Sequence, residues 1–182
     1  MEYAEVNSVI RLAEPKDIDG LVAINAKWQR ETLSTTKNGF LSGRFSEATF
    51  TNIITNEDII VLDVENLICG YYLINNDPSD SQLQALRDKI HELKQKGLIP
   101  KNAATGVATQ VLIDEAYQGK GFRKILLTQL IKTIGNRYHY LFSTISKENN
   151  KSQKANNKDG WELVAENEKV FFVMLDVKNY TE

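Results

Sequence analysis

The chain has 182 residues, which is enough for one domain with a substantial hydrophobic core. Its 22 lysine and arginine residues stand against 24 aspartate and glutamate residues, and the formal net charge of −2 gives no global basic field for nucleic acid or a membrane surface. A single cysteine, Cys69, excludes an internal disulfide framework and a cysteine-based metal cluster; we expect it to be a small apolar residue in a strand.

The first residues, MEYAEVNSVIRLAE, have no basic region followed by an apolar run, as a secretory leader would. No stretch of the chain approaches the ~20 apolar residues that a membrane-spanning helix needs. We therefore expect a cytoplasmic protein that has neither a membrane nor a nucleic acid as partner.

The first half of the sequence predicts a strand, two helices and a hairpin. Residues 8–13 form a short strand, and a helix over 14–31 follows, in which Pro15 suits the first turn. The inward positions of this helix recur at helical spacing: Ile18, Leu21, Val22 and Trp28. Residues 32–44 are rich in Gly, Ser and Thr and predict a mobile loop, and a second helix over 46–55 follows with Phe50, Ile53 and Ile54 inward.

The hairpin consists of strands over 58–64 and 67–74. Only Glu65 and Asn66 separate them, which favours a tight antiparallel turn. Tyr71 and Tyr72 lie next to each other in the second strand, so one should face a cleft and the other the core.

A helix then begins near Pro78 and ends at Gly97. Its apolar positions form a narrow stripe that covers a neighbouring element: Leu83, Leu86, Ile90 and Leu93. We interpret residues 78–100 as a helical insertion at the surface of the domain, with His91 in solvent.

The second half predicts a strand over 106–113, a helix, another strand over 138–145 and a final strand pair over 160–166 and 169–177. The helix has one apolar row, Phe122, Leu126, Leu130 and Ile134, joined by Ile125, and Gly135 stops it. The element order predicts one α/β domain over residues 1–182, with a central mixed, mostly antiparallel sheet flanked by helices.

The segment DEAYQGKGFRKILL, residues 114–127, places two glycines and three cations where a strand ends and a helix begins. The first turn of a helix has backbone N–H groups without intrahelical partners, and the helix dipole adds positive charge there. Glycine lets a ligand approach the backbone closely. The pattern therefore predicts an anion site, most naturally for phosphate, although a plain strand–helix turn with solvated cations is the alternative.

Three phosphate-binding motifs compete for this segment. The spacing of a Walker loop is absent, and Lys124 stands where a dinucleotide-binding fingerprint has its third glycine. The pyrophosphate loop of acyl-CoA-dependent N-acyltransferases, Q/R-x-x-G-x-G/A, fits residues 118–123 at all but its last position, which is Arg123.

At this segment the chain resembles the GNAT superfamily of acyl-CoA-dependent N-acetyltransferases, and the resemblance runs over most of its length. VLIDEAYQGKGFRKILL is similar to the family's central strand, loop and helix. The later N-N-K-S…K-D-G-W-E-L-V resembles its "N…G-F" segment, with Asn149 and Gly160-Trp161 in matching places. The resemblance implies a GNAT-like fold and acetyl-CoA as cosubstrate, with no metal.

The resemblance also implies which residues bind the cosubstrate. The strand before the loop would splay from its neighbour and pair with the pantetheine arm through Val111, Leu112 and Ile113. The pyrophosphate would lie on the loop, and Asn149 would contact the pantetheine. The cofactor-binding loop comprises Gln118, Gly119, Lys120, Gly121, Phe122, Arg123 and Lys124, with the amides of Gly119 through Lys124 as donors. With Arg123 in place of the usual Gly or Ala, the side chain must point away from the pyrophosphate or along it.

Four lysines follow the next strand at spacings of 4, 3 and 4: Lys147, Lys151, Lys154 and Lys158. If residues 149–158 are helical, these side chains line one face. They would then be either a solvated stripe or an electrostatic aid for the phosphates of CoA or for an acidic substrate.

The implied reaction moves an acetyl group from acetyl-CoA to a primary amine of a small molecule or peptide. Many relatives have a tyrosine as general acid four residues before the glycine of "G-F", but here the position is Asn156, which cannot donate a proton in that way. Glu31, Asp63 and His139 are possible bases without a spacing argument, and the central strand offers Thr109 and Gln110. We assign no catalytic residue. The substrate is expected near Trp28, Glu31 and the 32–44 loop.

Two other functions stay open. A non-catalytic or weakly active CoA-binding regulatory module would explain Asn156 and the missing base. A nucleotide-binding or interaction domain would require the GKGFRK turn to be incidental. The apolar run VFFVML, residues 170–175, could reach a partner in a homodimer.

Overall fold

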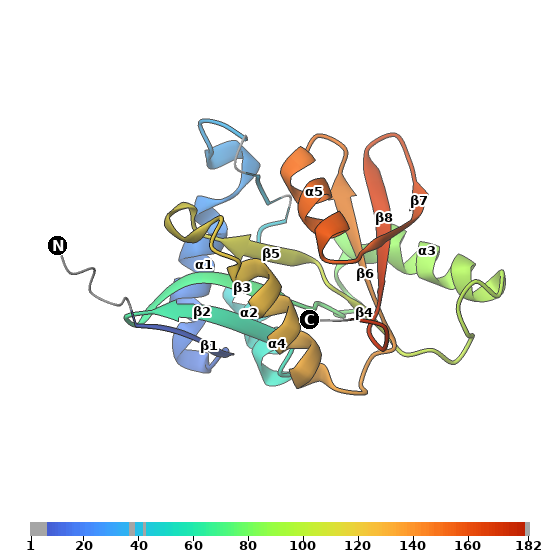
Figure 1. Ribbon diagram of the computed structural model, residues 1–182, viewed down its shortest axis with the longest axis horizontal. Helices are drawn as coiled ribbons and strands as arrows, with labels where there is room; N and C mark the ends of the chain where they lie inside the picture. The colour runs from blue at the N-terminus through green and yellow to red at the C-terminus, as the bar shows by residue number, and fades with distance from the viewer. Residues whose placement is uncertain (1–6, 37–38, 42, 181–182) are drawn as a thin grey trace.

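The computed structural model describes residues 7–36, 39–41 and 43–180 of the chain, and it contains two four-stranded sheets that lie side by side (Figure 1). The first sheet has the order β1-β2-β3-β5 and is antiparallel; the second has the order β4-β6-β8-β7, with β4 parallel to β6. The strands are β1 (Ser8–Leu12), β2 (Ile59–Val64), β3 (Leu67–Leu73), β4 (Thr105–Val107), β5 (Gln110–Ile113), β6 (Tyr140–Ser146), β7 (Glu162–Glu166) and β8 (Val170–Asp176). This arrangement confirms the predicted mixed, mostly antiparallel α/β fold.

Helices cover both sheets (Figure 1). They are α1 (Ile18–Lys27), α2 (Glu47–Thr55), α3 (Gln84–Gln95), α4 (Phe122–Ile134) and α5 (Asn150–Lys158). Helices α1 and α2 pack on one face of the first sheet and α4 on the other, while α3 packs on the second sheet. The apolar stripe of α3 is buried against Val107, Phe142 and Phe172, as the helical spacing predicts; its status as an insertion and the single-domain boundaries stay predictions.

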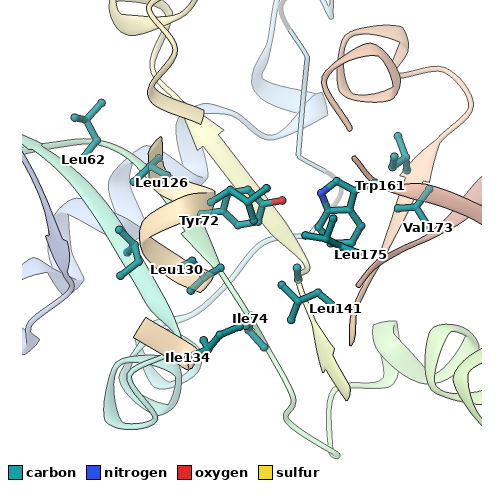
Figure 2. Packing of buried hydrophobic residues seen from close by; sticks show 14 of the residues in the cluster. Leu62, Tyr72, Ile74, Leu126, Leu130, Ile134, Leu141, Trp161, Val173 and Leu175 are labelled. Atoms are coloured by element: carbon teal, nitrogen blue, oxygen red, sulfur yellow. The ribbon is translucent and has the colours of Figure 1, made fainter. Parts of the chain in front are cut away.

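One hydrophobic cluster joins the two sheets. Figure 2 shows Tyr72, Leu126 and Leu130 on the side of the first sheet and α4, with Trp161 and Leu175 from the second sheet facing them. Burial on both faces also explains the apolar run in β8: Phe172 packs toward α3, whereas Val173 and Leu175 belong to the joint cluster. Because these side chains are used within the chain, the homodimer has no support from this run and stays a prediction.

The turn between β2 and β3 confirms the predicted hairpin. Glu65 and Asn66 both have positive φ, 52° and 67°, and a two-residue turn with two such residues matches the twist of the strands that it joins. Polar residues tolerate this conformation better than β-branched ones do.

The prediction of one continuous strand over 106–113 is wrong. Ala108 still donates its N–H to the Phe142 carbonyl of β6 at 2.8 Å, but Gln110 already pairs with Leu73 of β3. The chain therefore leaves one sheet and joins the other at Thr109. An apolar run predicts an extended backbone, but it does not show that the strand changes partners.

Two helices differ from the pattern read in the sequence. In α4, Ile125 is 49% exposed and Leu127 is buried in its place. Helix α1 ends at Lys27, followed by a short 3₁₀ helix over Arg30–Thr32, and its buried residues are Leu21, Ile24 and Asn25, whereas Ile18 and Val22 are half-buried. A helix with apolar residues on more than one row has several possible inner faces, and packing on the sheet selects one.

Within the described residues, no helix is both long and apolar enough to cross a membrane. The absence of a leader was predicted from a segment whose residues 1–6 lie outside the described part of the chain, as do residues 37–38 and 42 of the predicted 32–44 loop.

Candidate functional site

The loop between β5 and α4 is built around two glycines in the left-handed region of the backbone. Gly119 has a φ of 77° and Gly121 a φ of 82°, and Gly121 is the N-cap of α4. A Cβ added at either position would meet no atom within 4 Å. Glycine is thus needed here for its backbone conformation, a reason that adds to the predicted close approach of a ligand.

The backbone N–H groups of residues 119–123 have no hydrogen-bond acceptor among the described residues. They lie at the N-terminus of α4, where the helix dipole is positive. A cavity of about 280 Å³ opens against them and is lined by Gly119, Gly121, Phe122 and β5. The predicted anion site therefore has the donors and the space that it requires. The N–H of Lys124 does not share this property, because it donates to the Gly121 carbonyl at 3.1 Å.

The edge of β5 that faces away from β3 continues this site. Asp114 donates its N–H to the Cys69 carbonyl, so in the alternating ladder Leu112 is hydrogen-bonded to β3 and Val111 and Ile113 present their backbone groups to the opposite edge. Residues 111–113 line the cavity of the loop. The strand edge and the loop amides therefore border one continuous cavity.

The side chain of Gln118 makes hydrogen bonds within the protein that support the loop. Its Nε2 donates to the Ile113 carbonyl at 2.8 Å, and its Oε1 accepts from Lys151 of α5. The Gln118 side chain therefore links the loop to the last residue of β5 and to α5 by hydrogen bonds.

The cations near the loop have different positions. Arg123 points inward: its Nε donates to Asp159 at 2.5 Å, and its guanidinium lies 5.7 Å from the centre of the Tyr72 ring. Lys120 lies over the Tyr117 ring. Residues 150–158 are helical, as the lysine spacing required, and of the four lysines in that row only Lys151 lines the cavity.

A second cavity of about 330 Å³ adjoins the first through Phe40, Leu41, Val111 and Ser152, which line both. Asn149 and Asn156 also line it. Asn149 caps α5 by accepting from the Ser152 N–H at 3.1 Å and donates to the Phe40 carbonyl at 3.3 Å; its contact with pantetheine stays a prediction. Asn156 donates to the Ser152 carbonyl at 2.8 Å.

The two adjacent tyrosines of β3 face opposite sides of the sheet, as alternation predicts, and both are buried. Tyr72 lines the second cavity, and burial raises its pKa to about 12, so its hydroxyl stays protonated at physiological pH. Burial likewise raises the pKa of Tyr71, whose hydroxyl donates to Gln110 at 2.8 Å.

A network of hydrogen bonds between buried polar side chains borders the second cavity through Gln110 and Gly43, and the sequence does not reveal it. Asn25 Nδ2 donates to both the Tyr71 hydroxyl and Gln110 Oε1, and Gln110 Nε2 donates to the Gly43 carbonyl at 2.6 Å. Gln29 also donates to the Gly43 carbonyl. These bonds fix the segment around Gly43 beside β5. An Asn inside an amphipathic helix pattern is the one signal in the sequence that could have indicated the network.

The predicted bases lie outside both cavities. Glu31 is exposed and 3.6 Å from Arg44, Asp63 pairs with Arg11, and His139 Nδ1 accepts from the Ala104 N–H. Thr109 and Gln110 do line the second cavity. Among the described residues no three His, Cys, Asp or Glu side chains are grouped so that they could hold a metal ion.

No protein-family model matches the chain, and no curated protein shows significant sequence similarity to it. Solved structures of GNAT-type acetyltransferases do match its fold. They include PaiA N-acetyltransferase from Thermoplasma acidophilum in complex with coenzyme A, at 13% identity and a TM-score of 0.65 over 93% of this chain and 99% of that one. Another is YncA, a putative acetyltransferase from Salmonella typhimurium with acetyl-CoA, at 17% identity and a TM-score of 0.62 over 97% of each chain.

A third is the diaminobutyrate acetyltransferase EctA from Paenibacillus lautus, in complex with its substrate and coenzyme A, at 14% identity and a TM-score of 0.61 over 97% of this chain and 99% of that one. The chain therefore has the fold of the GNAT acetyltransferases, as the residues of the loop and the element order predicted.

Proposed function

We propose that the chain is an N-acetyltransferase that moves an acetyl group from acetyl-CoA to a primary amine of a small molecule or peptide. The observation that carries this proposal is that the free N–H groups of residues 119–123 and the outward-facing N–H groups of Val111 and Ile113 border one cavity. Neighbours of the same fold that hold acetyl-CoA or coenzyme A support it.

In this reaction the nitrogen lone pair of a neutral amine attacks the thioester carbonyl carbon. The C–S bond breaks, the thiolate leaves with the electron pair, and the amine proton passes through solvent or a base to the sulfur. The Val111 N–H lies on the free strand edge, where it can polarise the thioester carbonyl. A lysine-like amine has a reference pKa of about 10.4, so loss of its proton precedes attack.

Titration with acetyl-CoA tests the cosubstrate, and detection of free thiol across a panel of amines tests the transfer. We expect binding of acetyl-CoA and CoA, and thiol release that requires an amine. Gly121→Trp should abolish binding, because the new side chain fills the space in front of the loop amides.

Gly97→Trp is the matched control. Gly97 also has a positive φ, 69°, and no atom within 4 Å of an added Cβ, but it lies at the end of α3 and lines neither cavity. The Gly97→Trp variant should impose a similar conformational strain on the backbone and leave the affinity for acetyl-CoA and CoA unchanged. If neither acetyl-CoA nor CoA binds to the wild-type chain, the proposal is wrong.

A non-catalytic CoA-binding module is the second candidate. It is favoured by Asn156, which lines the cavity where a proton donor is expected and already donates to the Ser152 carbonyl. Binding of CoA with no thiol release across the amine panel would favour this candidate over the enzyme.

A further inference from the structure

The second cavity contains one charged residue, Asp80, among the described residues that line it. Asp80 belongs to the segment between β3 and α3, directly before a short 3₁₀ helix over Ser81–Leu83. None of the bases considered from the sequence lies there, and the pattern around Asp80 does not distinguish it from an ordinary helix-capping residue.

The Asp80 carboxylate is held in place by two hydrogen bonds. Its Oδ2 accepts from Asn75 Nδ2 at 3.1 Å, and its Oδ1 accepts from the Gln82 N–H at 2.9 Å. Asn75 is fully buried, so this anchor is rigid. Each carboxylate oxygen has a second acceptor site, and the half-buried side chain can therefore accept from a ligand without losing either bond.

The remaining wall of the cavity is largely apolar or neutral. Its large apolar side chains come from three parts of the fold: Phe40, Phe45, Leu83, Leu86 and Phe172. Thr109 also lines this cavity, although its hydroxyl oxygen is buried and has no hydrogen-bond partner among the described residues.

No arginine is among the described residues that line this cavity, and Arg44, which stands between the lining residues Gly43 and Phe45, lies 3.6 Å from Glu31. Arg87 donates to the backbone carbonyls of Asp77 and Asp80, and Arg30 pairs with Glu148. A ligand carboxylate in the cavity would thus lie beside the Asp80 carboxylate and have no cationic partner among the described lining residues. Like charges in a partly desolvated site repel strongly, and an unpaired charge there is costly.

We propose that the acceptor site selects a small primary amine with an apolar body and no carboxylate, such as an arylalkylamine or a branched alkylamine. Asp80 binds the ammonium group of the arriving acceptor, and the phenylalanine and leucine side chains hold its apolar part. This inference rests on the proposed function, because it assigns the second cavity to the acceptor. It narrows the acceptor from any primary amine to amines that carry no carboxylate group.

Matched pairs of an amine and its parent amino acid test the inference: phenethylamine with phenylalanine, tyramine with tyrosine, and isoamylamine with leucine. Their affinities are measured on the full chain saturated with CoA, and their kcat/KM values with acetyl-CoA. We expect the amine of each pair to bind at least about tenfold more tightly, which is the effect of one uncompensated charged contact.

Two readouts separate this inference from the proposed function. Tighter binding of the amines without thiol release would support the charge selectivity and overturn the enzyme. Acetylation of the amino acids as efficiently as of the amines would support the enzyme and overturn the inference. Failure of every amine to bind the CoA-saturated chain would also overturn the inference.

The variant Asp80→Asn identifies the residue responsible. Asparagine retains the acceptor for the Gln82 N–H, so the local turn is preserved, and the amine affinity should fall about tenfold or more while CoA affinity is unchanged. Asp77→Asn is the matched control, because Asp77 makes the same kind of bond, to the Ser79 N–H at 2.8 Å, and does not line this cavity. Equal amine affinity in the two variants would contradict the role of Asp80.

Discussion

Arg123, in the first turn after the loop, forms an ion pair that we expect to contribute to the stability of the fold. Its guanidinium is 20% exposed and pairs with Asp159, whose carboxylate is only 8% exposed. The pair joins the first turn of α4 to the residue that ends α5. From the sequence, a cation at this position could lie along the pyrophosphate or away from it; the structure pairs Arg123 with Asp159 and also places it among the residues that line the first cavity.

Replacement of Arg123 by Gln should therefore lower the free energy of unfolding by about 3 kcal/mol, because it leaves a buried carboxylate without its partner. The double variant Arg123→Gln/Asp159→Asn should recover at least half of this loss. Urea unfolding at pH 7 measures both values.

Lys151→Gln provides the comparison, since it removes one positive charge from the same cavity. Lys151 is exposed, so its replacement should change the unfolding free energy by less than about 1 kcal/mol while weakening CoA binding. A destabilisation by Arg123→Gln as small as that of Lys151→Gln would contradict the inward role of Arg123.

The residue types of the loop were predictable from the sequence, but their individual tasks were not. The two glycines and the start of α4 follow from the spacing Q-G-K-G-F-R. The contact of Gln118 with Lys151 depends on the position of α5, which is distant in the sequence. Asp80 was missed for the same reason, since only the folded chain brings it to the cavity that β5 also lines.

At the scale of elements, Arg11 of β1 connects two strands of the first sheet, β1 and β2, with the short 3₁₀ helix over Pro15–Asp17 that precedes α1. It makes a bidentate pair with Asp17, at 2.7 and 2.9 Å, and also donates to Asp63 of β2 at 2.7 Å. Burial raises the pKa of Asp17, but the hydrogen bonds from Arg11 and from the Glu14 N–H together outweigh it and hold that pKa below its usual value.

Because the pKa of Asp17 is lower in the folded chain than in the unfolded one, its contribution to stability is present above the unfolded value of about 3.9 and is lost as the pH falls. Arg11→Met should cost about 3 kcal/mol at pH 7, and the difference from the wild type should shrink below about pH 4 as Asp17 takes up a proton. Urea unfolding at a series of pH values measures this difference.

Lys27→Met is the control, because the Lys27–Asp114 pair has a lysine that is 60% exposed and should contribute less than about 1 kcal/mol. A cost for Arg11→Met that is the same at pH 3 as at pH 7 would show that the pairing with Asp17 does not carry it.

The elements themselves were largely predictable, and their partners less so. The β2–β3 hairpin follows from two turn residues, and the stripe of α3 from helical spacing. The division of residues 105–113 between two sheets depends on which neighbours Val107 and Val111 meet, β6 and β3 respectively. A similar run of apolar residues is compatible with either partner.

At the scale of the whole molecule, the change of partner at Thr109 leaves the two sheets joined by the cluster around Tyr72 and Trp161 but separated along β5 (Figure 2). The order of elements and the residues of the loop together predicted the fold. It could not predict the depth of the two cavities, because they are bounded by residues from β5, β6, α5 and the segment around Gly43.

If CoA binds along β5, its arm supplies hydrogen-bond partners to the free edge of that strand. The amides of Val111 and Ile113 should then exchange with solvent more slowly when CoA is added, because they point to the open edge. The amides of Leu112 and Asp114 serve as internal controls, since they already face β3, where Asp114 donates to Cys69 at 2.8 Å. Residue-resolved hydrogen exchange by NMR, with and without CoA, measures all four.

The expected pattern alternates along the strand: large gains in protection at residues 111 and 113, and small ones at 112 and 114. Global stabilisation by the ligand would slow all four amides, by RT ln(1 + [L]/Kd) when exchange requires complete unfolding, or about 2.7 kcal/mol at a hundredfold excess over Kd. An even gain across the four residues would thus show that CoA stabilises the fold without pairing with β5, and an alternating gain would place its arm on the strand edge.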